Sequence, residues 1–217
     1  AERAAPVTQL TSNDYRLSNS LNRFDFTSNG YRLSGLRPSL TGRHQITNAA
    51  LAVKAAVHLQ KCGFEVTKRA IRKGLTNTCW PGRFQVIRRP NRPTVVLDVG
   101  HNEKGMRTFV DTFASTFPGR QARVITGFVR RKEHQLMVDS LSEIADGFLL
   151  VPLATHRSTD VRDLMASLDF HGLPVRRSGS LGVAWRKTLE QSSVDDIIAI
   201  VGSHYLVGEF LQKYERK

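Results

Sequence analysis

The residues best able to do chemistry follow a short apolar run at residues 94–99. Asp98, His101 and Asn102 place an acid, an imidazole and an amide where that run gives way to a predicted helix. A carboxylate here can accept both hydroxyls of a ribose, and a histidine near a helix start can contact a phosphate or a reacting carboxylate. The spacing leaves a second interpretation open, in which Asp98 caps the loop and His101 is a solvated turn residue.

Two later apolar runs are also followed by polar residues. Lys132 belongs to a run of three cations after residues 123–127, and Ser203 with Tyr205 follows residues 196–202. Cations can hold phosphate oxygens, and hydroxyls close to the positive end of a helix can bind a carboxylate. Both groups of polar residues are equally typical of a solvated surface without a ligand, so this second interpretation also stays open.

The first half of the chain holds two more candidates. Asn48 lies at the start of a strongly periodic segment, where helix capping is the alternative role. Arg83 lies in the sequence Trp-Pro-Gly-Arg-Phe at residues 80–84, and its planar guanidinium can bridge two phosphate oxygens. A surface ion pair is the alternative for Arg83.

Strands and helices that alternate along the chain must position these residues. Such alternation predicts an α/β fold with a mainly parallel sheet covered on both faces, and ligands of such sheets bind beyond the carboxyl ends of the strands. Apolar runs predict strands at 94–99, 123–127, 147–152 and 196–202, and helical spacing predicts helices near 104–117, 133–145, 160–168, 181–191 and 205–214.

The first half has a different pattern. Apolar and polar residues alternate on either side of Ser-Asn-Gly within residues 22–34, which predicts a hairpin, and helices are expected at 46–63 and 67–75. The Arg/Pro stretch at 88–93 is a plausible linker. We therefore predict one domain at residues 1–88 and a second at 92–217.

Composition excludes several classes of protein. No apolar run approaches the roughly 20 residues that cross a bilayer, no secretory signal opens the chain, and Cys62 and Cys79 lack the spacing of a zinc site, so a cytoplasmic protein without membrane partners is expected. The net charge of +13 is concentrated at residues 1–90, where 15 Lys and Arg face 4 Asp and Glu. Without a nucleic-acid-binding motif or interleaved aromatics, this charge points to anionic small substrates or an acidic partner segment and not to nucleic acid.

Six motifs in series resemble the folylpolyglutamate synthase/dihydrofolate synthase family within the Mur ligase superfamily. The forms Trp-Pro-Gly-Arg-Phe and Gly-Ser-x-Tyr-Leu-Val-Gly-Glu resemble the folate branch more than the peptidoglycan branch. The motifs are G-R-H-Q-I-T-N-A at 42–49, W-P-G-R-F-Q at 80–85, L-D-V-G-H-N at 97–102, R-K-E at 131–133, H-R at 156–157 and G-S-H-Y-L-V-G-E at 202–209.

This resemblance implies an ATP-dependent ligase that adds L-glutamate to dihydropteroate or folate through an acyl phosphate. It implies that residues 1–88 end a central ATPase domain and that 92–217 form the Rossmann-like, Mur ligase carboxyl-terminal domain that binds glutamate. No Gly-x-x-x-x-Gly-Lys-Ser/Thr loop and no Gly-x-Gly-x-x-Gly occurs in the sequence, so the phosphate-binding loop and most ligands of Mg²⁺ are expected in a missing amino-terminal ATPase region. The fragment alone is expected to be inactive.

The resemblance also assigns roles by motif position. Asn48 would contact adenine, Arg83 the phosphates and Asp98 the ribose of ATP. His101 and Lys132 would be catalytic, beside the acyl phosphate. His101 would also contact glutamate, and Ser203 and Tyr205 would hold it; no metal ligand is assigned within the chain.

The chain departs from the family pattern in three places: D-V-G-H-N-E at 98–103 replaces D-G-A-H-N-P, R-K-E at 131–133 replaces D-K-D, and one position of the last motif differs. His204 replaces an apolar residue there, and this change is expected to alter glutamate selection. A non-catalytic, truncated domain that binds a nucleotide or an acidic amino acid remains the alternative function.

Overall fold

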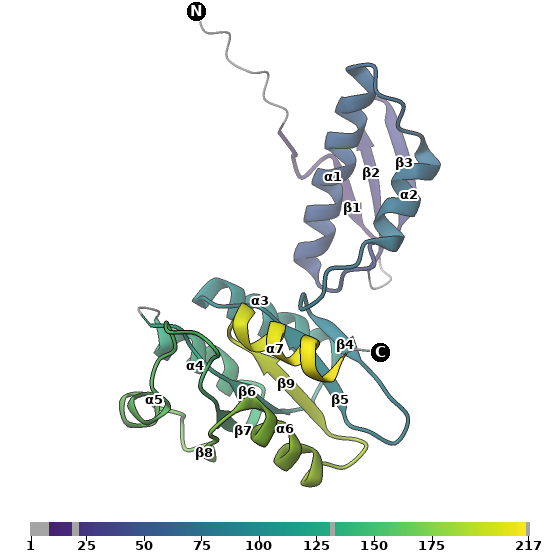
Figure 1. The fold of residues 1–217 in the computed structure, drawn as a ribbon. Helices are drawn as coiled ribbons and strands as arrows, with labels where there is room; N and C mark the ends of the chain where they lie inside the picture. The colour runs from purple at the N-terminus through teal and green to yellow at the C-terminus, as the bar shows by residue number, and fades with distance from the viewer. Residues whose placement is uncertain (1–8, 19–21, 131–132, 216–217) are drawn as a thin grey trace, which may run out of the picture. The chain divides into compact units, whose positions relative to one another are not determined.

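The computed structural model describes residues 9–18, 22–130 and 133–215. The chain divides into two compact units, Ala1–Trp80 and Pro81–Lys217 (Figure 1). In the described part of the chain, no helix combines the length and apolar character that a membrane crossing requires.

The first unit is a small antiparallel sheet packed against two helices. Its strands β1 (Tyr15–Leu17), β2 (Phe24–Ser28) and β3 (Tyr31–Leu36) lie in chain order, and α1 (Arg43–Lys61) packs on β2 while α2 (Lys68–Asn77) packs on β3. The alternation in β2 buries every second side chain in the core of this unit. The predicted hairpin and both predicted helices are confirmed.

The second unit is a six-stranded sheet of order β4-β5-β9-β6-β7-β8. All neighbouring strands run parallel except β4, which pairs antiparallel with β5. The predicted α/β fold with a mainly parallel sheet is therefore confirmed. The strands are β4 (Gln85–Ile87), β5 (Thr94–Asp98), β6 (Ala122–Thr126), β7 (Ala145–Leu150), β8 (Val175–Arg177) and β9 (Ile197–Val201).

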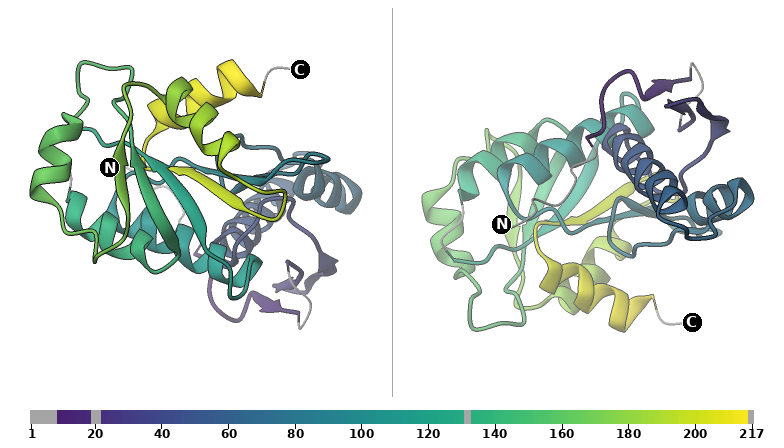
Figure 2. Two further views of the ribbon diagram at one scale, coloured as in Figure 1. Left: turned by 90° about the horizontal axis from the view of Figure 1, so that it is seen from below. Right: turned by 90° about the horizontal axis from the view of Figure 1, so that it is seen from above.

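Helices cover both faces of this sheet. Helices α3 and α4 pack against each other over one face, and α6 with α7 covers the other (Figure 2). The strands between them read as apolar runs because both of their faces are buried; β9 is buried at every position. The helices are α3 (Glu103–Thr116), α4 (His134–Ser142), α5 (Val161–Ser167), α6 (Leu181–Glu190) and α7 (His204–Tyr214).

The stretch at residues 88–93, expected as a linker, is instead the loop of a hairpin. It joins β4 to β5, whose residues Val86 and Val96 are paired antiparallel. The division between the compact units falls earlier, after Trp80. The sequence prediction missed this pairing because β4 is only three residues long and half-buried, and a segment so short does not reveal its partner strand.

Candidate functional site

The strand order brings the loops after the first and last parallel strands together. β9 lies between β5 and β6. In the register of the sheet, Val201 pairs with Asp98 on one side and with Thr126 on the other. The segments beginning at Val99, Gly127 and Gly202 therefore leave the sheet side by side at its carboxyl edge. This is the edge at which open parallel sheets bind ligands.

Asp98 anchors this edge through two backbone hydrogen bonds. Its Oδ1 accepts from the Gly100 N–H at 2.7 Å, and its Oδ2 accepts from the Phe84 N–H at 2.8 Å. Burial raises the pKa of Asp98, while these hydrogen bonds and the charge of Arg83 oppose the rise. The loop-capping role left open by the sequence is therefore present in the structure.

The turn around Arg83 is shaped by a close approach of the backbone to α7. Gly82 has φ +75°, and a Cβ there would lie 2.8 Å from a methyl carbon of Val207 and 2.9 Å from one of Val99. The Gly82 carbonyl accepts a hydrogen bond from the Val99 N–H at 2.8 Å. These contacts fix the turn that bears the exposed Arg83.

His101 and His204 form a pair across the two loops. Their ring centroids lie 5.0 Å apart with an interplanar angle of 51°. His101 Nδ1 lies 3.1 Å from the Val99 carbonyl, so a proton on Nδ1 is donated there and Nε2 is left as the second polar atom of the ring. Partial desolvation is the main cause that lowers the pKa of His204, which is still an exposed residue, and the nearby His101 and Arg83 lower it further.

Ser203 and Tyr205 occupy the start of α7. Ser203 is the N-cap, with its buried Oγ accepting from the Tyr205 N–H at 3.1 Å, whereas the Tyr205 side chain is 43% exposed. Gly202 before them has φ +120°, and a Cβ there would lie 2.5 Å from Thr126 Oγ1. A side chain at position 202 would displace that buried hydroxyl, so the close packing of β9 against β6 requires glycine.

Helix α3 begins at the same edge. Asn102 is its N-cap, and Asn102 Oδ1 accepts from the Gly105 N–H at 2.8 Å. The amino ends of α3 and α7 thus follow β5 and β9 directly. Both helix dipoles place partial positive charge at the edge of the sheet that carries His101 and His204, which favours an anionic ligand there.

Asn48 belongs to the first unit and is not a helix cap. The N-cap of α1 is Gly42, with φ 116°, and Asn48 lies inside the helix, where its Nδ2 donates to Gln45 Oε1 at 3.2 Å. The capping alternative for Asn48 is therefore wrong. Lys132 lies outside the described residues.

The structure brings together Arg83, Asp98, His101, Ser203 and Tyr205, all within the second unit. His204 lies beside them and contacts His101; the sequence connects it with glutamate selection but does not predict this contact. The available signal was its departure from the motif at 202–209, where a histidine stands in place of an apolar residue. Its contact with His101 depends on the pairing of β5 with β9, which no local pattern encodes.

Comparisons with known proteins fit this geometry. Residues 82–204 match a family model described as Mur ligase, glutamate ligase domain. The dihydrofolate synthase/folylpolyglutamate synthase of Bacillus subtilis (strain 168) is 26% identical over 192 residues, which cover 88% of this chain and 44% of that protein.

Solved structures are similar in the same way. The folylpolyglutamate synthase of Mycobacterium tuberculosis, complexed with ADP and AMPPCP, gives a TM-score of 0.80 at 23% identity, over 95% of this chain and 49% of that one. A bifunctional folylpolyglutamate synthase/dihydrofolate synthase with Mn, AMPPNP and L-glutamate bound gives a TM-score of 0.75 at 25% identity. The match covers 94% of this chain and 47% of that one. The chain spans about half the length of these relatives.

Proposed function

Because this chain belongs to the Mur ligase family through its glutamate ligase domain, we propose that it is the carboxyl-terminal portion of an ATP-dependent ligase that adds L-glutamate to dihydropteroate or folate. The observation that carries the proposal is the placement of Asp98, His101 and Ser203 on two loops that leave adjacent strands. Relatives with this fold are named folylpolyglutamate synthase or dihydrofolate synthase, and one solved relative binds a nucleotide analogue and L-glutamate.

In this proposal the second unit binds ribose, phosphate and glutamate. Each Asp98 oxygen accepts one backbone N–H and keeps a further lone pair, so the carboxylate can still accept ribose hydroxyls. Arg83, exposed on the rigid turn before β4, supplies a positive charge for phosphate oxygens. His101 and the amino end of α7, where Ser203 and Tyr205 lie, face the incoming glutamate.

The proposed reaction runs in two steps. The γ-phosphoryl group of ATP is transferred to the carboxylate of dihydropteroate or folate, which gives an acyl phosphate and ADP. The amino group of glutamate then attacks the acyl carbon and an amide bond forms. Inorganic phosphate leaves with the electrons of the broken C–O bond and takes up the proton that the nitrogen loses. Arg83 and the proposed Lys132 supply the positive charge that stabilises the departing oxygen.

The first unit is proposed to end the ATP-binding domain, with Asn48 against the adenine. The sequence holds no phosphate-binding loop, so the proposal assigns that loop to an amino-terminal ATPase region. Among the described residues there is no group of three or more His, Cys, Asp and Glu that could hold a metal ion. The proposal places most ligands of Mg²⁺ in the amino-terminal region as well.

Incorporation of radiolabelled L-glutamate into dihydropteroate tests the proposal. The chain alone, given ATP and Mg²⁺, is expected to form no product. A fusion of the chain behind the amino-terminal region of the Bacillus subtilis relative is expected to form it, and His101→Ala should lower the rate by roughly 100-fold. The control is His171→Ala, at an exposed histidine paired with Asp139 outside the site.

Each other outcome has a definite meaning. Turnover by the chain alone would contradict the proposed need for an ATPase region. A folded but inert fusion that still binds ADP or L-glutamate by calorimetry would favour the non-catalytic binding domain. A folded fusion that neither turns over nor binds would overturn the proposal.

A further inference from the structure

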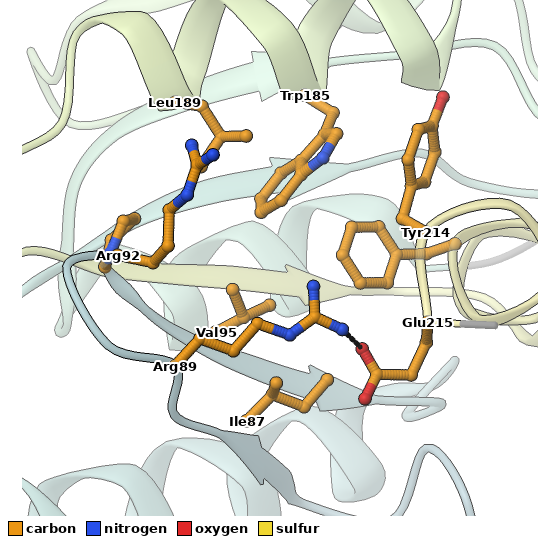
Figure 3. Close-up of a pocket in the computed structure, with 10 residues that line it drawn as sticks. Ile87, Arg89, Arg92, Val95, Trp185, Leu189, Tyr214 and Glu215 are labelled. Atoms are coloured by element: carbon orange, nitrogen blue, oxygen red, sulfur yellow. Dashed lines mark hydrogen bonds and ion pairs between the residues drawn. The ribbon is translucent and has the colours of Figure 1, made fainter. Parts of the chain in front are cut away.

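A cavity lies in the second unit, away from the carboxyl edge of the sheet. Its volume is about 220 Å³, and it opens between the β4–β5 hairpin loop and helices α6 and α7 (Figure 3). The hairpin contributes residues at the amino end of β5, the opposite end of that strand from Asp98. The cavity is lined by Ile87, Arg89, Arg92, Pro93, Val95, Trp185, Leu189, Phe210, Tyr214 and Glu215.

One wall of the cavity is aromatic and held in place. Trp185 packs edge-to-face on Phe210, with centroids 4.9 Å apart at 88°, and lies 6.2 Å from Tyr214. Phe210 is 2% exposed, so it anchors the other two rings to the core. The indole N–H of Trp185 has no hydrogen-bond acceptor among the described residues. The wall therefore offers flat apolar surface and one available donor.

The facing wall carries two arginines on a short turn. The Arg92 N–H donates to the Arg89 carbonyl at 3.3 Å, and Asn91 between them has φ 56°, so the turn holds both side chains at the cavity. Pro90 and Pro93 restrict the turn further. Figure 3 shows Arg89 and Arg92 on the hairpin side and Trp185 on the helix side of the same space.

The two arginines differ in charge balance. Arg89 Nη2 donates to Glu215 Oε2 at 2.8 Å, which neutralises its charge (Figure 3). No carboxylate pairs with Arg92 anywhere in the part of the chain that the structure describes. The cavity thus carries one uncompensated positive charge beside an aromatic wall.

We propose that this cavity binds a small aromatic carboxylate, a monoanion with one ring or two fused rings. The carboxylate pairs with the planar fork of Arg92, which matches its two oxygens, and the ring packs on Trp185. One uncompensated cation matches one negative charge and disfavours a phosphate dianion. A cavity of about 150 Å³ already holds benzene, so the present volume admits such rings. The site is independent of the proposed ligase function.

The test uses the ¹⁵N-labelled chain and two matched probes, 1-naphthoate and the neutral 1-naphthamide. The sequence has two tryptophans, Trp80 and Trp185, and Trp80→Phe assigns their indole N–H signals in the NMR spectrum. We expect 1-naphthoate to shift the Trp185 signal saturably and to leave the Trp80 signal in place. The amide should bind about tenfold more weakly, because a charged acceptor strengthens the hydrogen bonds of Arg92.

Three variants separate this site from general attraction of anions. Arg92→Gln should weaken 1-naphthoate binding about tenfold. Arg88→Gln is the control, since Arg88 lies on the same hairpin but over the Phe117 ring, 5.6 Å from its centroid, and not at the cavity. Glu215→Gln should tighten binding because it frees Arg89, a gain that a folding defect does not produce.

The proposal is overturned by any of three results. The first is a Trp185 signal that 1-naphthoate does not shift in the folded chain. The second is equal affinity for 1-naphthoate and 1-naphthamide, which would leave an apolar cavity without charge recognition. The third is an equal loss of affinity in Arg92→Gln and Arg88→Gln, which would indicate binding through net charge alone.

Discussion

The imidazole rings of His101 and His204 lie with their centroids 5.0 Å apart, although 102 residues lie between them in the sequence. The contact exists because β5 and β9 are hydrogen-bonded neighbours whose following loops leave the sheet together. Arg83 adds a third group that carries or can accept a positive charge. Its charge lowers the pKa of His204 and opposes the rise in the pKa of Asp98. The site therefore couples one carboxylate to three groups that can carry positive charge.

Replacement of His204 should change how the stability of the protein depends on pH. Its pKa is lowered on folding, chiefly by partial desolvation, so the unfolded chain binds more protons than the folded protein below the ordinary value of 6.5. Stability should fall as the pH drops through that value, and His204→Asn should remove part of this fall. Urea unfolding of both proteins at about pH 5 and about pH 8 measures the difference. An equal loss of stability between the two pH values in both proteins would contradict a lowered pKa of His204.

Asp98→Asn should destabilise the second unit by about 1–3 kcal/mol. The asparagine oxygen can accept only one of the two N–H groups, from Gly100 and Phe84, and its amide group faces the other donor. Asp111→Asn is the control, because that side chain is 64% exposed in a surface ion pair and should cost less than about 1 kcal/mol. Denaturant unfolding compares the two, and equal losses would show that the Asp98 hydrogen bonds add little.

Two glycines near the start of α7 should respond in opposite directions. Gly202→Ala should destabilise the protein by about 1–3 kcal/mol, because φ is +120° there and a Cβ would lie 2.5 Å from Thr126 Oγ1. Gly208→Ala should stabilise it by about 0.5–1 kcal/mol, because no atom lies within 4 Å of that Cβ and alanine favours a helix. Thermal unfolding of both variants measures whether each change raises or lowers stability. A change in the same direction for both would contradict the packing described for β9 and β6.

The buried ion pair of the first unit predicts acid sensitivity. Lys54 Nζ lies 2.7 Å from Asp14 Oδ2, and this hydrogen bond from Lys54 is the chief cause that holds the pKa of Asp14 well below its ordinary value of 3.8. The stabilisation is present above that value and is lost as the pH falls below it. Lys54→Met should therefore cost about 1–3 kcal/mol at neutral pH and reduce the sensitivity to acid.

The matched control for Lys54→Met is Lys73→Met, at an exposed position of α2, where a change within about 0.5 kcal/mol is expected. Circular dichroism during acid titration follows both variants. Equal acid midpoints for Lys54→Met and the unmodified chain would show that the ion pair does not set the acid response.

Local patterns were enough to predict the helices, the β2–β3 hairpin and the strands β5, β6, β7 and β9, but not the three-residue strands β1, β4 and β8. Apolar runs bounded by polar residues marked the strands, and the polar residues after β5 and β9 were identified because ligands of parallel sheets bind at carboxyl ends. Asp98, His101 and Ser203 lie at that edge as expected. Their chemical roles remain predictions.

Non-local pairing could not be predicted in the same way. The position of β9 between β5 and β6 brings His204 to His101, and the pairing of β4 with β5 turns the expected linker into a hairpin. The Phe84 N–H that holds Asp98 comes from a residue with φ 40°, a conformation that no periodicity reveals. Each depends on a contact that crosses at least a loop, from the hairpin of β4 and β5 to the distant pairing of β5 with β9, and local spacing carries little information about such contacts.

The insertion of β9 between β5 and β6 also determines when the second unit can fold during synthesis. Until residues 197–201 leave the ribosome, β5 and β6 each present an unpaired inner edge, and such edges invite pairing with other chains. The last strand made is thus the one that joins the two parts of the sheet. A nascent chain that stalls before Ile197 has neither a continuous sheet nor an assembled candidate site.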